Sequence, residues 1–419
     1  MPIANHFAAR LIPALPDLVE TYGTPFHIYD AAGIAATHRQ MMAAFPPGTF
    51  KQYFAVKALP NPHVLSLLLS EGSGLDCSSP AELLLAERVG AREDSVVFTS
   101  NNTTVEEYRQ ARSLGALITF DDRAILDRID RLPAVVAFRV APHGGTAGSS
   151  LMGDGANSKF GVPANEIVDA YRAAQRRGAT RFGIHAMTYA NELDVARAAV
   201  AAQSLFALAR RLAETIGVEF EYINIGGGLG IPYRSMDRPF DFAAFASTIV
   251  TERHRVFGRA APLILMECGR YVTGPHGVLV TRVVNRCRKA KEIAGVDASI
   301  SALMRPAFYG DAHHHVTIPF AGERPVIAVD VVGSLCENID KFAVDRLLPD
   351  PRIGDILLVH DTGAHCLAMG FTYNGRLRPA ELMMTERGDI LEIRRAETFD
   401  DYVATVQWEP IAVRRSDMG

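Results

Sequence analysis

Short apolar runs alternate with longer amphipathic stretches between about residues 50 and 270. The runs have the length of β-strands and lie at residues 51–57, 73–77, 95–99, 116–120, 134–140, 182–186, 221–226 and 262–267. Helix-like patterns follow them, for example at residues 80–89, 104–114, 164–177 and 193–216. Eight strands, each followed by a crossover that is long enough for a helix, predict a (β/α)8 TIM-like barrel.

The pattern changes after about residue 275. The runs GVLVTRVV, VIAVDVV, DILLVHD and GDILEIRR are separated by proline and glycine turns and show little helical periodicity. They predict a C-terminal, mainly antiparallel β-sandwich or β-barrel domain at residues 276–419, after a (β/α)8 barrel at residues 26–275. A strand candidate at residues 26–29 can belong to either unit, and we expect residues 1–25 to join the β domain. The Gly/Ser-rich stretch 142–158 follows the fifth strand and predicts a mobile loop.

Composition narrows the class of protein. The chain has 419 residues, of which 48% are hydrophobic and 21% are charged, and its formal net charge is −4. This balance gives no reason to expect nucleic acid or a membrane surface as a partner, and no apolar stretch reaches the ~18 residues of a membrane span. Residues 1–11 lack a signal-peptide pattern, and the five cysteines are an odd, scattered set without Cys-x-x-Cys. We therefore expect a cytoplasmic protein with reduced thiols.

Polar residues recur at the ends of the predicted strands, where barrel enzymes carry their chemistry. Lysine forms Schiff bases once its pKa is lowered, and a buried ammonium is costly unless it is used or paired. Taken alone, a lysine at a strand end more often reaches out to solvent than takes part in a reaction. Six polar strand ends together favour an active-site rim, because each would otherwise need a buried partner. These ends carry Lys57, Asp76, Arg139, His185, the glycines at 226–228, and Glu267.

The cluster IGGGLG directly follows a strand. Its glycines allow backbone N–H groups to approach an anion closely, although a tight barrel turn explains them as well. The dinucleotide fingerprint G-x-G-x-x-G is absent. Glu267 can hold an aromatic ring nitrogen protonated or pair with neighbouring Arg270, and His185 can stack on a flat ring or be held by a hydrogen bond. The run HHH at residues 313–315 predicts no metal site, because adjacent strand residues point to opposite faces.

On these residues the chain resembles the fold-type III pyridoxal-phosphate decarboxylases, which share the alanine racemase-like fold, and within them the diaminopimelate decarboxylases. The resemblance runs in family order through YFAVKALPNP, GLDCSSPAEL, TSNNTT, SKFGV, INIGGGLGIPY, ECGRY, LMRPAFYGDAHHH, GSLCENID and DTGAHCLAMGFTYNGRLRPAE. There are departures: ECGR replaces E-P-G-R, HAMTY replaces H-I-G-S-Q, and CENID replaces C-E-S-G-D. Met187 thus stands where the family has a glycine beside the cofactor phosphate, and Asn338 and Ile339 alter the loop that closes over substrate.

The resemblance implies pyridoxal 5'-phosphate as cofactor and a homodimer with shared active sites. Lys57 would carry the covalent link to the cofactor, His185 would stack on its ring, Glu267 would pair with the ring nitrogen, and Cys336 would supply a proton. Residues implied to bind the cofactor are Lys57, Asp76, His185, Thr188, Gly226, Gly227, Gly228, Glu267, Gly269, Arg270 and Tyr373. Residues implied to bind an amino-acid substrate are Arg270, Arg305, Tyr309, Tyr373 and Glu337, with Cys336 and Glu337 reaching in from the other subunit.

The expected activity is decarboxylation of meso-diaminopimelate to L-lysine and carbon dioxide, a step of lysine biosynthesis. Two arginines suit a substrate whose distal end bears a carboxylate. The alternatives are D-ornithine, D-lysine, or a siderophore- or carrier-linked amino acid as substrate, a regulator that has lost activity, and a racemase. Retention of Lys57 and Cys336 disfavours the regulator, and the C-E pair at 336–337 does not suit the tyrosine base of a racemase.

Overall fold

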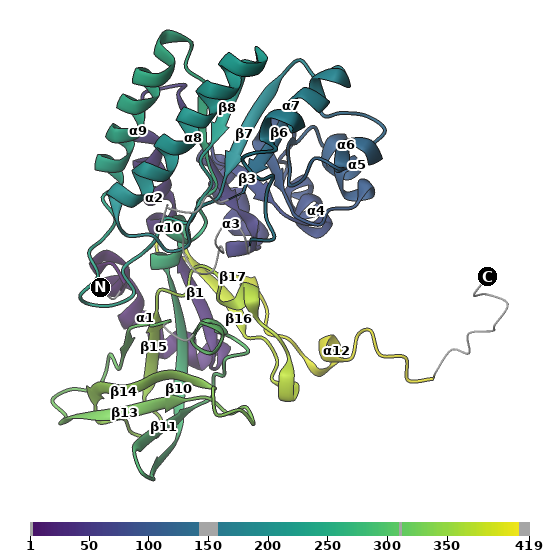
Figure 1. Ribbon diagram of the computed structural model, residues 1–419. Helices are drawn as coiled ribbons and strands as arrows, with labels where there is room; N and C mark the ends of the chain where they lie inside the picture. Colours follow the sequence, from purple (N-terminus) through teal and green to yellow (C-terminus); the bar gives the residue numbers. More distant parts are fainter. Residues whose placement is uncertain (1–2, 142–157, 310–311, 410–419) are drawn as a thin grey trace.

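Eight parallel strands close into a barrel in chain order, as the alternating pattern predicts. The computed structural model describes residues 3–141, 158–309 and 312–409, and Figure 1 shows the barrel with its helices above a second sheet. Every pair of neighbouring strands is parallel, and the first strand pairs with the last. The strands are β2 (Phe50–Ala55), β3 (Gly74–Cys77), β4 (Val96–Thr99), β5 (Leu117–Phe120), β6 (Val136–Val140), β7 (Phe182–Ala186), β8 (Phe220–Asn224) and β9 (Leu263–Met266). All eight predicted strands are confirmed.

Successive residues of these strands face opposite sides of the barrel wall. Because the strands consist largely of apolar residues, both faces of the wall are apolar. The cluster inside the barrel consists of Tyr53, Val97, Val135, Ala137, Tyr222 and Leu265. Phe54 and Ile223, which follow the two tyrosines along the chain, pack in the main core with the helices. Gly74 and Gly183 make room for the tyrosine rings, because a Cβ at either glycine would lie 2.3 Å from a ring atom.

The helices of the barrel lie outside the strands. Helix α8 shows how the sequence sets their ends: Asp194 accepts a hydrogen bond from the amide of Ala196 at 2.8 Å, and Gly217, with φ of 66°, ends the helix. The predicted helices at 80–89, 104–114, 164–177 and 193–216 correspond to α4, α5, α7 and α8. The bounds are α2 (Ala31–Ala43), α3 (Pro62–Ser70), α4 (Pro80–Arg88), α5 (Val105–Ser113), α6 (Ile125–Arg128), α7 (Ile167–Arg176), α8 (Val195–Ile216), α9 (Phe242–Phe257) and α10 (Arg270–Thr273).

A second, mainly antiparallel sheet of nine strands forms the other unit in the described part of the chain. Only β1–β16 and β11–β13 are parallel pairs. The strands are β1 (Phe26–Asp30), β10 (Gly277–Arg288), β11 (Glu292–Val296), β12 (Val316–Thr317), β13 (Val326–Val332), β14 (Lys341–Pro349), β15 (Ile356–His360), β16 (Ala380–Met384) and β17 (Ile390–Arg394). The remaining α-helices are α1 (Asn5–Tyr22), α11 (Arg305–Phe308) and α12 (Phe399–Tyr402). The predicted C-terminal β unit is confirmed as this sheet.

Strand β1 lies in the second sheet. Ile28 stands opposite Val278 of β10 and Leu382 of β16, and Phe7 and Leu11 of α1 pack in the same apolar cluster. The expected barrel unit, residues 26–275, is therefore wrong for this strand, which belongs to the second sheet. The apolar strand FHIY suits either sheet by pattern alone, and its pairing decides the question. The other expected unit boundaries, at residues 25 and 275, stay predictions.

The turn that follows β2 is fixed by the C-terminal unit. The carbonyl oxygen of Ala58 accepts a hydrogen bond from the amide of His365 at 2.8 Å. Three residues further on, the side-chain amide of Asn61 donates to Glu381 of β16 at 2.9 Å, and Glu381 also accepts from the hydroxyl of Tyr29 at 2.7 Å. All these groups belong to the junction of barrel and sheet, so the C-terminal unit helps to shape one edge of the barrel rim.

Among the residues that the structure describes, no helix combines the length and the apolar character that a membrane span requires. The five cysteines are free. The stretch expected to form a mobile loop, 142–158, lies outside the described residues except for Ser158.

Candidate active site

Lys57 lies just beyond the end of β2. The strand ends at Ala55, and Lys57 is the middle residue of η1 (Val56–Ala58), a single 3-10 turn. The residue is exposed, so the expectation of a buried ammonium that closes the strand is wrong: the chain turns before the lysine. Lys57 forms no hydrogen bond or ion pair with any residue in the described part of the chain. Its amine is therefore available to a ligand at the rim.

Polar side chains from several strands meet at this rim. Arg139 on β6 is the register partner of His185 on β7, and His185 is in turn the partner of Asn224 on β8. Glu267 follows β9 directly, and its Oε2 lies 3.1 Å from Nε2 of His185. All four are buried. The structure thus brings together strand-end residues that stand far apart in the sequence.

The carboxylate of Glu267 is held by three hydrogen-bond donors. Oε1 accepts from Asn224 Nδ2 at 2.7 Å and from the hydroxyl of Thr99 at 3.0 Å, and Oε2 accepts from His185 Nε2. Burial alone would raise the pKa of Glu267, but His185, Arg139 and the bond from Asn224 outweigh it and lower the pKa to about 2. Glu267 is therefore ionised at neutral pH. It pairs with His185, not with its neighbour Arg270 as the alternative supposed.

Several buried polar atoms near Glu267 lack a protein partner. They include Oδ1 of Asp76 at the end of β3, Nδ1 of His185 and Nε of Arg139. Burial, followed by the charge of Glu267, raises the pKa of Asp76 well above its ordinary value, while the charge of Lys57 opposes the shift. Buried polar atoms rarely stay without a hydrogen bond. The set predicts a polar ligand with both donors and acceptors at this rim.

The loop of three glycines after β8 packs closely against its neighbours. Gly226 and Gly228 have φ of 71° and 86°, which favours glycine, and a Cβ on Gly227 would lie 2.2 Å from the carbonyl oxygen of Glu267. The amide of Gly227 donates to the sulfur of Met187 at 3.2 Å. Thr188, next to Met187, is half-buried and has no hydrogen bond among the described residues. Met187 therefore already engages one of the amides that an anion would use.

Gly269 connects this rim to the Lys57 turn. It is the N-terminal cap of α10, and a Cβ there would lie 2.6 Å from the Cβ of Ala58. A larger residue would push the start of α10 away from the turn. The glycine therefore keeps Arg270, the first residue of α10, close to Lys57.

Two arginines converge on the ring of Tyr233. Arg270 donates from Nη1 to the Tyr233 hydroxyl at 2.6 Å, and the guanidinium carbon of Arg305 lies 4.0 Å from the ring centroid. Arg305 is 5% exposed and comes from the C-terminal unit. Within the described residues, neither arginine forms an ion pair with a carboxylate. Tyr309 ends α11, four residues after Arg305, and is half-buried with its ring against Phe308.

Cys336, Glu337 and Tyr373 lie together on the surface of the C-terminal unit. The amide of Cys336 donates to Oδ1 of Asn374 at 2.8 Å, and the hydroxyl of Tyr373 donates to Glu337 at 3.2 Å. Cys336 and Glu337 are exposed, as is Tyr373 at 52%. None of the three forms a hydrogen bond or ion pair with the described rim residues of its own chain. The structure does not bring Tyr373 to the glycine loop, and the roles expected for these residues stay predictions.

Comparison with known proteins identifies the family. A model of the pyridoxal binding domain of pyridoxal-dependent decarboxylases matches residues 31–274. The diaminopimelate decarboxylase of Methanothermobacter thermautotrophicus is 36% identical, over 92% of this chain and 92% of that protein. The chain belongs to the diaminopimelate decarboxylase family. Protein TabA of Pseudomonas amygdali pv. tabaci is 60% identical, over 99% of this chain and 98% of that protein. A crystal structure of the M. jannaschii diaminopimelate decarboxylase with L-lysine has a TM-score of 0.87 and 26% identity, and covers 93% of this chain and 94% of that one.

As a member of this family the enzyme is a pyridoxal-phosphate-dependent decarboxylase, and its rim residues fit the cofactor. The amine of Lys57 is unpaired, the carboxylate of Glu267 is ionised, and the glycine loop offers backbone amides beside Arg270. His185 and Asp76 keep buried polar atoms without a partner. The one departure is Met187, whose sulfur occupies the Gly227 amide. When bound, pyridoxal phosphate supplies an electron sink for the electron pair that carbon dioxide leaves behind.

Sequence reasoning missed two residues of this site. His365 donates its backbone amide to Ala58, and burial, followed by the charges of Arg270, Lys57 and Arg305, lowers the pKa of its imidazole well below the ordinary value. It is therefore neutral and close to those cations. Tyr233 links the two arginines. Both stand inside motifs that the family resemblance covers, DTGAHC and GIPY, but nothing in the local pattern distinguishes them from structural residues.

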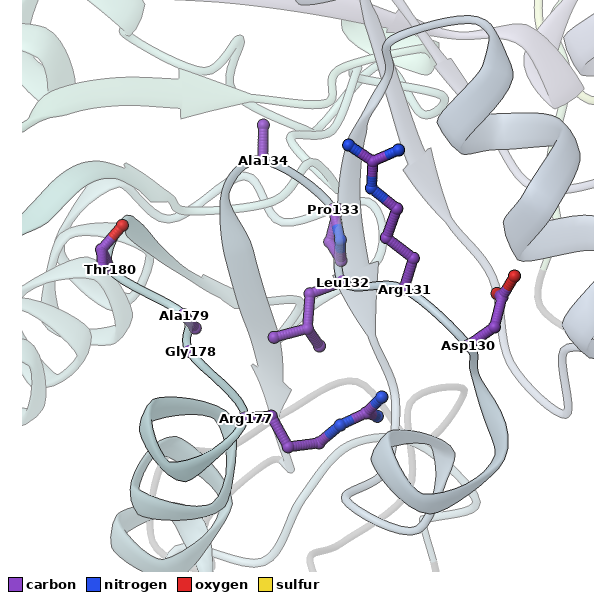
Figure 2. A pocket seen from close by; sticks show the side chains of 9 residues that line it. All are labelled: Asp130, Arg131, Leu132, Pro133, Ala134, Arg177, Gly178, Ala179 and Thr180. Atoms are coloured by element: carbon purple, nitrogen blue, oxygen red, sulfur yellow. The ribbon is translucent and has the colours of Figure 1, made fainter.

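A separate pocket of about 350 Å³ lies at the opposite end of the barrel. Figure 2 shows its lining, which comes from the segments that lead into β6 and β7. Two of its three charged side chains already have partners: Nη2 of Arg177 donates to the carbonyl of Ile129 at 2.9 Å, and Asp130 lies 3.4 Å from Nη1 of Arg112. The pocket faces away from the C-terminal ends of the strands, where barrel enzymes carry their chemistry.

Proposed function

We propose that the enzyme decarboxylates the D-configured centre of meso-diaminopimelate and releases L-lysine and carbon dioxide, as a step of lysine biosynthesis in the cytoplasm. The observation that carries this proposal is Arg305. Its guanidinium is buried at the rim and forms no ion pair with a described carboxylate. Burial raises the pKa of the Asp361 carboxyl, which feels the charge of Arg305, to about 7, so Asp361 is not a full counter-charge at neutral pH. An uncompensated buried charge costs several kcal/mol, so a substrate that brings a second carboxylate is the natural partner.

Arg270 strengthens the case for an anionic distal group. Its Nη1 is bonded to Tyr233, while its remaining N–H donors have no described partner. A guanidinium binds a carboxylate through two parallel hydrogen bonds. Two arginines on one tyrosine ring form a cationic platform that a simple diamine could not use. The relatives named diaminopimelate decarboxylases, and the M. jannaschii structure with L-lysine, support the same substrate class.

The remaining rim residues divide the other tasks in this proposal. Lys57, whose amine has no partner among the described residues, would hold the cofactor covalently. Glu267, ionised and held by three donors, keeps the ring nitrogen protonated. His185 would lie against the ring, while Asp76, Thr188, the glycine loop and Gly269 would line the cofactor site. Protonation of the carbon that loses carbon dioxide falls to Cys336, which has to come from a second subunit.

We further propose that two copies of the chain share each active site. Cys336 and Glu337 are exposed and bond to residues of their own surface, Asn374 and Tyr373. They do not reach the rim of their own barrel through any described contact. A second copy that covers this surface would bring Glu337 to the distal ammonium of the substrate and Cys336 to the reacting carbon. Tyr309 and Tyr373 would then line the substrate channel.

A related substrate is the second candidate. The 60% identity to Protein TabA, a name that specifies no substrate, exceeds the 36% identity to the M. thermautotrophicus diaminopimelate decarboxylase. Met187 occupies the Gly227 amide, and Ile339 is 58% exposed on the loop with Glu337. The altered loop favours a substrate whose distal end differs, such as D-ornithine, D-lysine, or a siderophore- or carrier-linked amino acid, whereas Met187 changes the glycine loop.

Carbon dioxide release from single substrates separates the two candidates. We expect the holoenzyme to release carbon dioxide from meso-diaminopimelate and to produce L-lysine, identified by chiral chromatography. D-lysine is the matched control, since it differs from meso-diaminopimelate only in lacking the distal carboxylate. Faster turnover of D-lysine or D-ornithine than of meso-diaminopimelate would refute the proposed substrate and favour the second candidate.

A further inference from the structure

The run of three histidines at 313–315 has no part in the function described so far. His314 is fully buried and lies between two fixed groups. Nη1 of Arg305 is 3.0 Å from its Nε2, and the carbonyl oxygen of His360 is 2.8 Å from its Nδ1. The middle histidine of this run therefore contacts the buried arginine of the site.

These two contacts settle the protonation of His314. An arginine only donates hydrogen bonds and a backbone carbonyl only accepts them. His314 must then carry its hydrogen on Nδ1 and accept on Nε2, which is the neutral form. Burial, followed by the charge of Arg305, lowers the pKa of His314 well below its ordinary value, in agreement with this form. If His314 were protonated, its Nε2–H would point at the N–H donor of Arg305, and no acceptor would lie between them.

Tyr233 holds the same arginine from its other side. Its ring centroid is 4.0 Å from the guanidinium carbon of Arg305 and 5.2 Å from the ring centroid of His314, at 67°. Its hydroxyl accepts from Arg270, and its backbone carbonyl accepts from Nδ1 of His313. Tyr233 itself is 4% exposed. A cation over an aromatic face is attracted to it. Tyr233 therefore contacts both arginines, Arg305 through its ring face and Arg270 through its hydroxyl.

We propose that His314 and Tyr233 are positioning residues that set the selectivity of this enzyme for a dicarboxylic substrate. They hold Arg305 at one end and along one face, so that Nε, which has no described partner, and Nη2 remain free for the distal carboxylate. Neither residue has to touch the cofactor. The inference rests on the proposed function, because it assigns the rim arginines to a distal carboxylate.

The test uses pimelate, a seven-carbon dicarboxylate without amino groups, as a competitive inhibitor of the holoenzyme. We expect His314→Ala to raise the inhibition constant of pimelate about tenfold or more, the worth of a hydrogen bond to a charged group. His314→Gln, which can still accept from Arg305 through its side-chain oxygen, should recover part of the loss. Tyr233→Leu should act like His314→Ala, whereas Tyr233→Phe keeps the ring and should disturb only the bond of Arg270.

The matched control is His254→Ala on α9, since His254 is exposed and its side chain has no bond to the described residues. Turnover of the best substrate should show a raised KM and a kcat within about threefold in His314→Ala, because the reacting groups are untouched. A kcat loss with unchanged pimelate inhibition would mean that His314 is merely structural, and would overturn the inference. If wild type is not inhibited by pimelate at all, the inference also fails. If pimelate inhibits as predicted but meso-diaminopimelate is not turned over, only the proposed substrate fails.

Discussion

Oε2 of Glu267 lies 3.1 Å from Nε2 of His185, although the two residues stand on different strands of the barrel. The carboxylate can only accept, so His185 donates from Nε2, and its Nδ1 is the atom left without a partner. This contact therefore helps to keep Glu267 ionised and sets the orientation of the imidazole. The proposed roles of both residues at the cofactor depend on this pair.

Replacement of Glu267 by glutamine tests its role as the partner of the ring nitrogen. A neutral amide does not favour the protonated ring, so we expect Glu267→Gln to bind the cofactor but to turn over substrate at least about 100-fold more slowly. The measurement is kcat under saturating cofactor, with the cofactor content read from its absorbance. A rate within about twofold of wild type would remove Glu267 from the chemistry.

The same variant makes a prediction about stability and pH. The pKa of Glu267 in the folded enzyme is about 2, lower than its ordinary value of 4.5. A depressed pKa means that the folded state binds fewer protons, so the contribution of Glu267 to stability is present above pH 4.5 and is lost as pH falls toward 2. We expect the difference in urea midpoint between wild type and Glu267→Gln to be nearly constant from pH 6 to about pH 5 and then to shrink as the pH falls from about 4.5 to 3. A difference that stays constant over this range would contradict the assigned ionisation.

Lys57→Ala should abolish turnover and the covalent attachment of the cofactor. Lys51→Ala is the matched control, because Lys51 lies on β2, the strand that leads to Lys57, and its Nζ bonds to the carbonyl of Asp94 at 2.6 Å, away from the rim. Borohydride reduction followed by mass spectrometry locates the modified lysine. Attachment at Lys51, or full activity of Lys57→Ala, would be inconsistent with the site described.

Mixing two inactive variants tests whether the sites are shared. A dimer of one Lys57→Ala chain and one Glu337→Ala chain carries both lesions in one site and none in the other. Random subunit exchange makes roughly half of the dimers mixed, so activity should recover to about a quarter of wild type. Each variant alone should stay inactive. Absence of recovery after proven subunit exchange would place Glu337 outside the partner's site.

The strands of the barrel could be predicted because their apolar runs are short and regularly spaced, and both faces of each strand are buried. The sequence could not show to which unit β1 belongs, because its apolar residues suit either sheet. Only the pairing of Ile28 with Val278 and Leu382 assigns it to the second sheet. The exposure of Lys57 was misjudged because the strand stops at Ala55 and a 3-10 turn follows. Such a turn leaves no mark in the hydrophobic pattern.

The site was predictable where it depends on strand ends, and unpredictable where it depends on contacts between the two units. His185 and Glu267 follow from the rule that the chemistry of barrel enzymes gathers at one rim. The ring of Tyr233 under Arg305, and His314 behind it, join the barrel to the C-terminal unit. No local signal predicts such a contact, so the run HHH could not be assigned to the arginine from the sequence.

Selectivity for the distal carboxylate is the central claim, and Arg305→Met tests it most directly. The measurement is kcat/KM for meso-diaminopimelate and for D-lysine, in wild type and in the variant. Methionine fills much of the same space without the charge, so kcat/KM for meso-diaminopimelate should fall by about 100-fold or more while that for D-lysine changes by less than about threefold. An equal loss for both substrates, or no loss for meso-diaminopimelate, would contradict the claim that Arg305 binds the distal carboxylate.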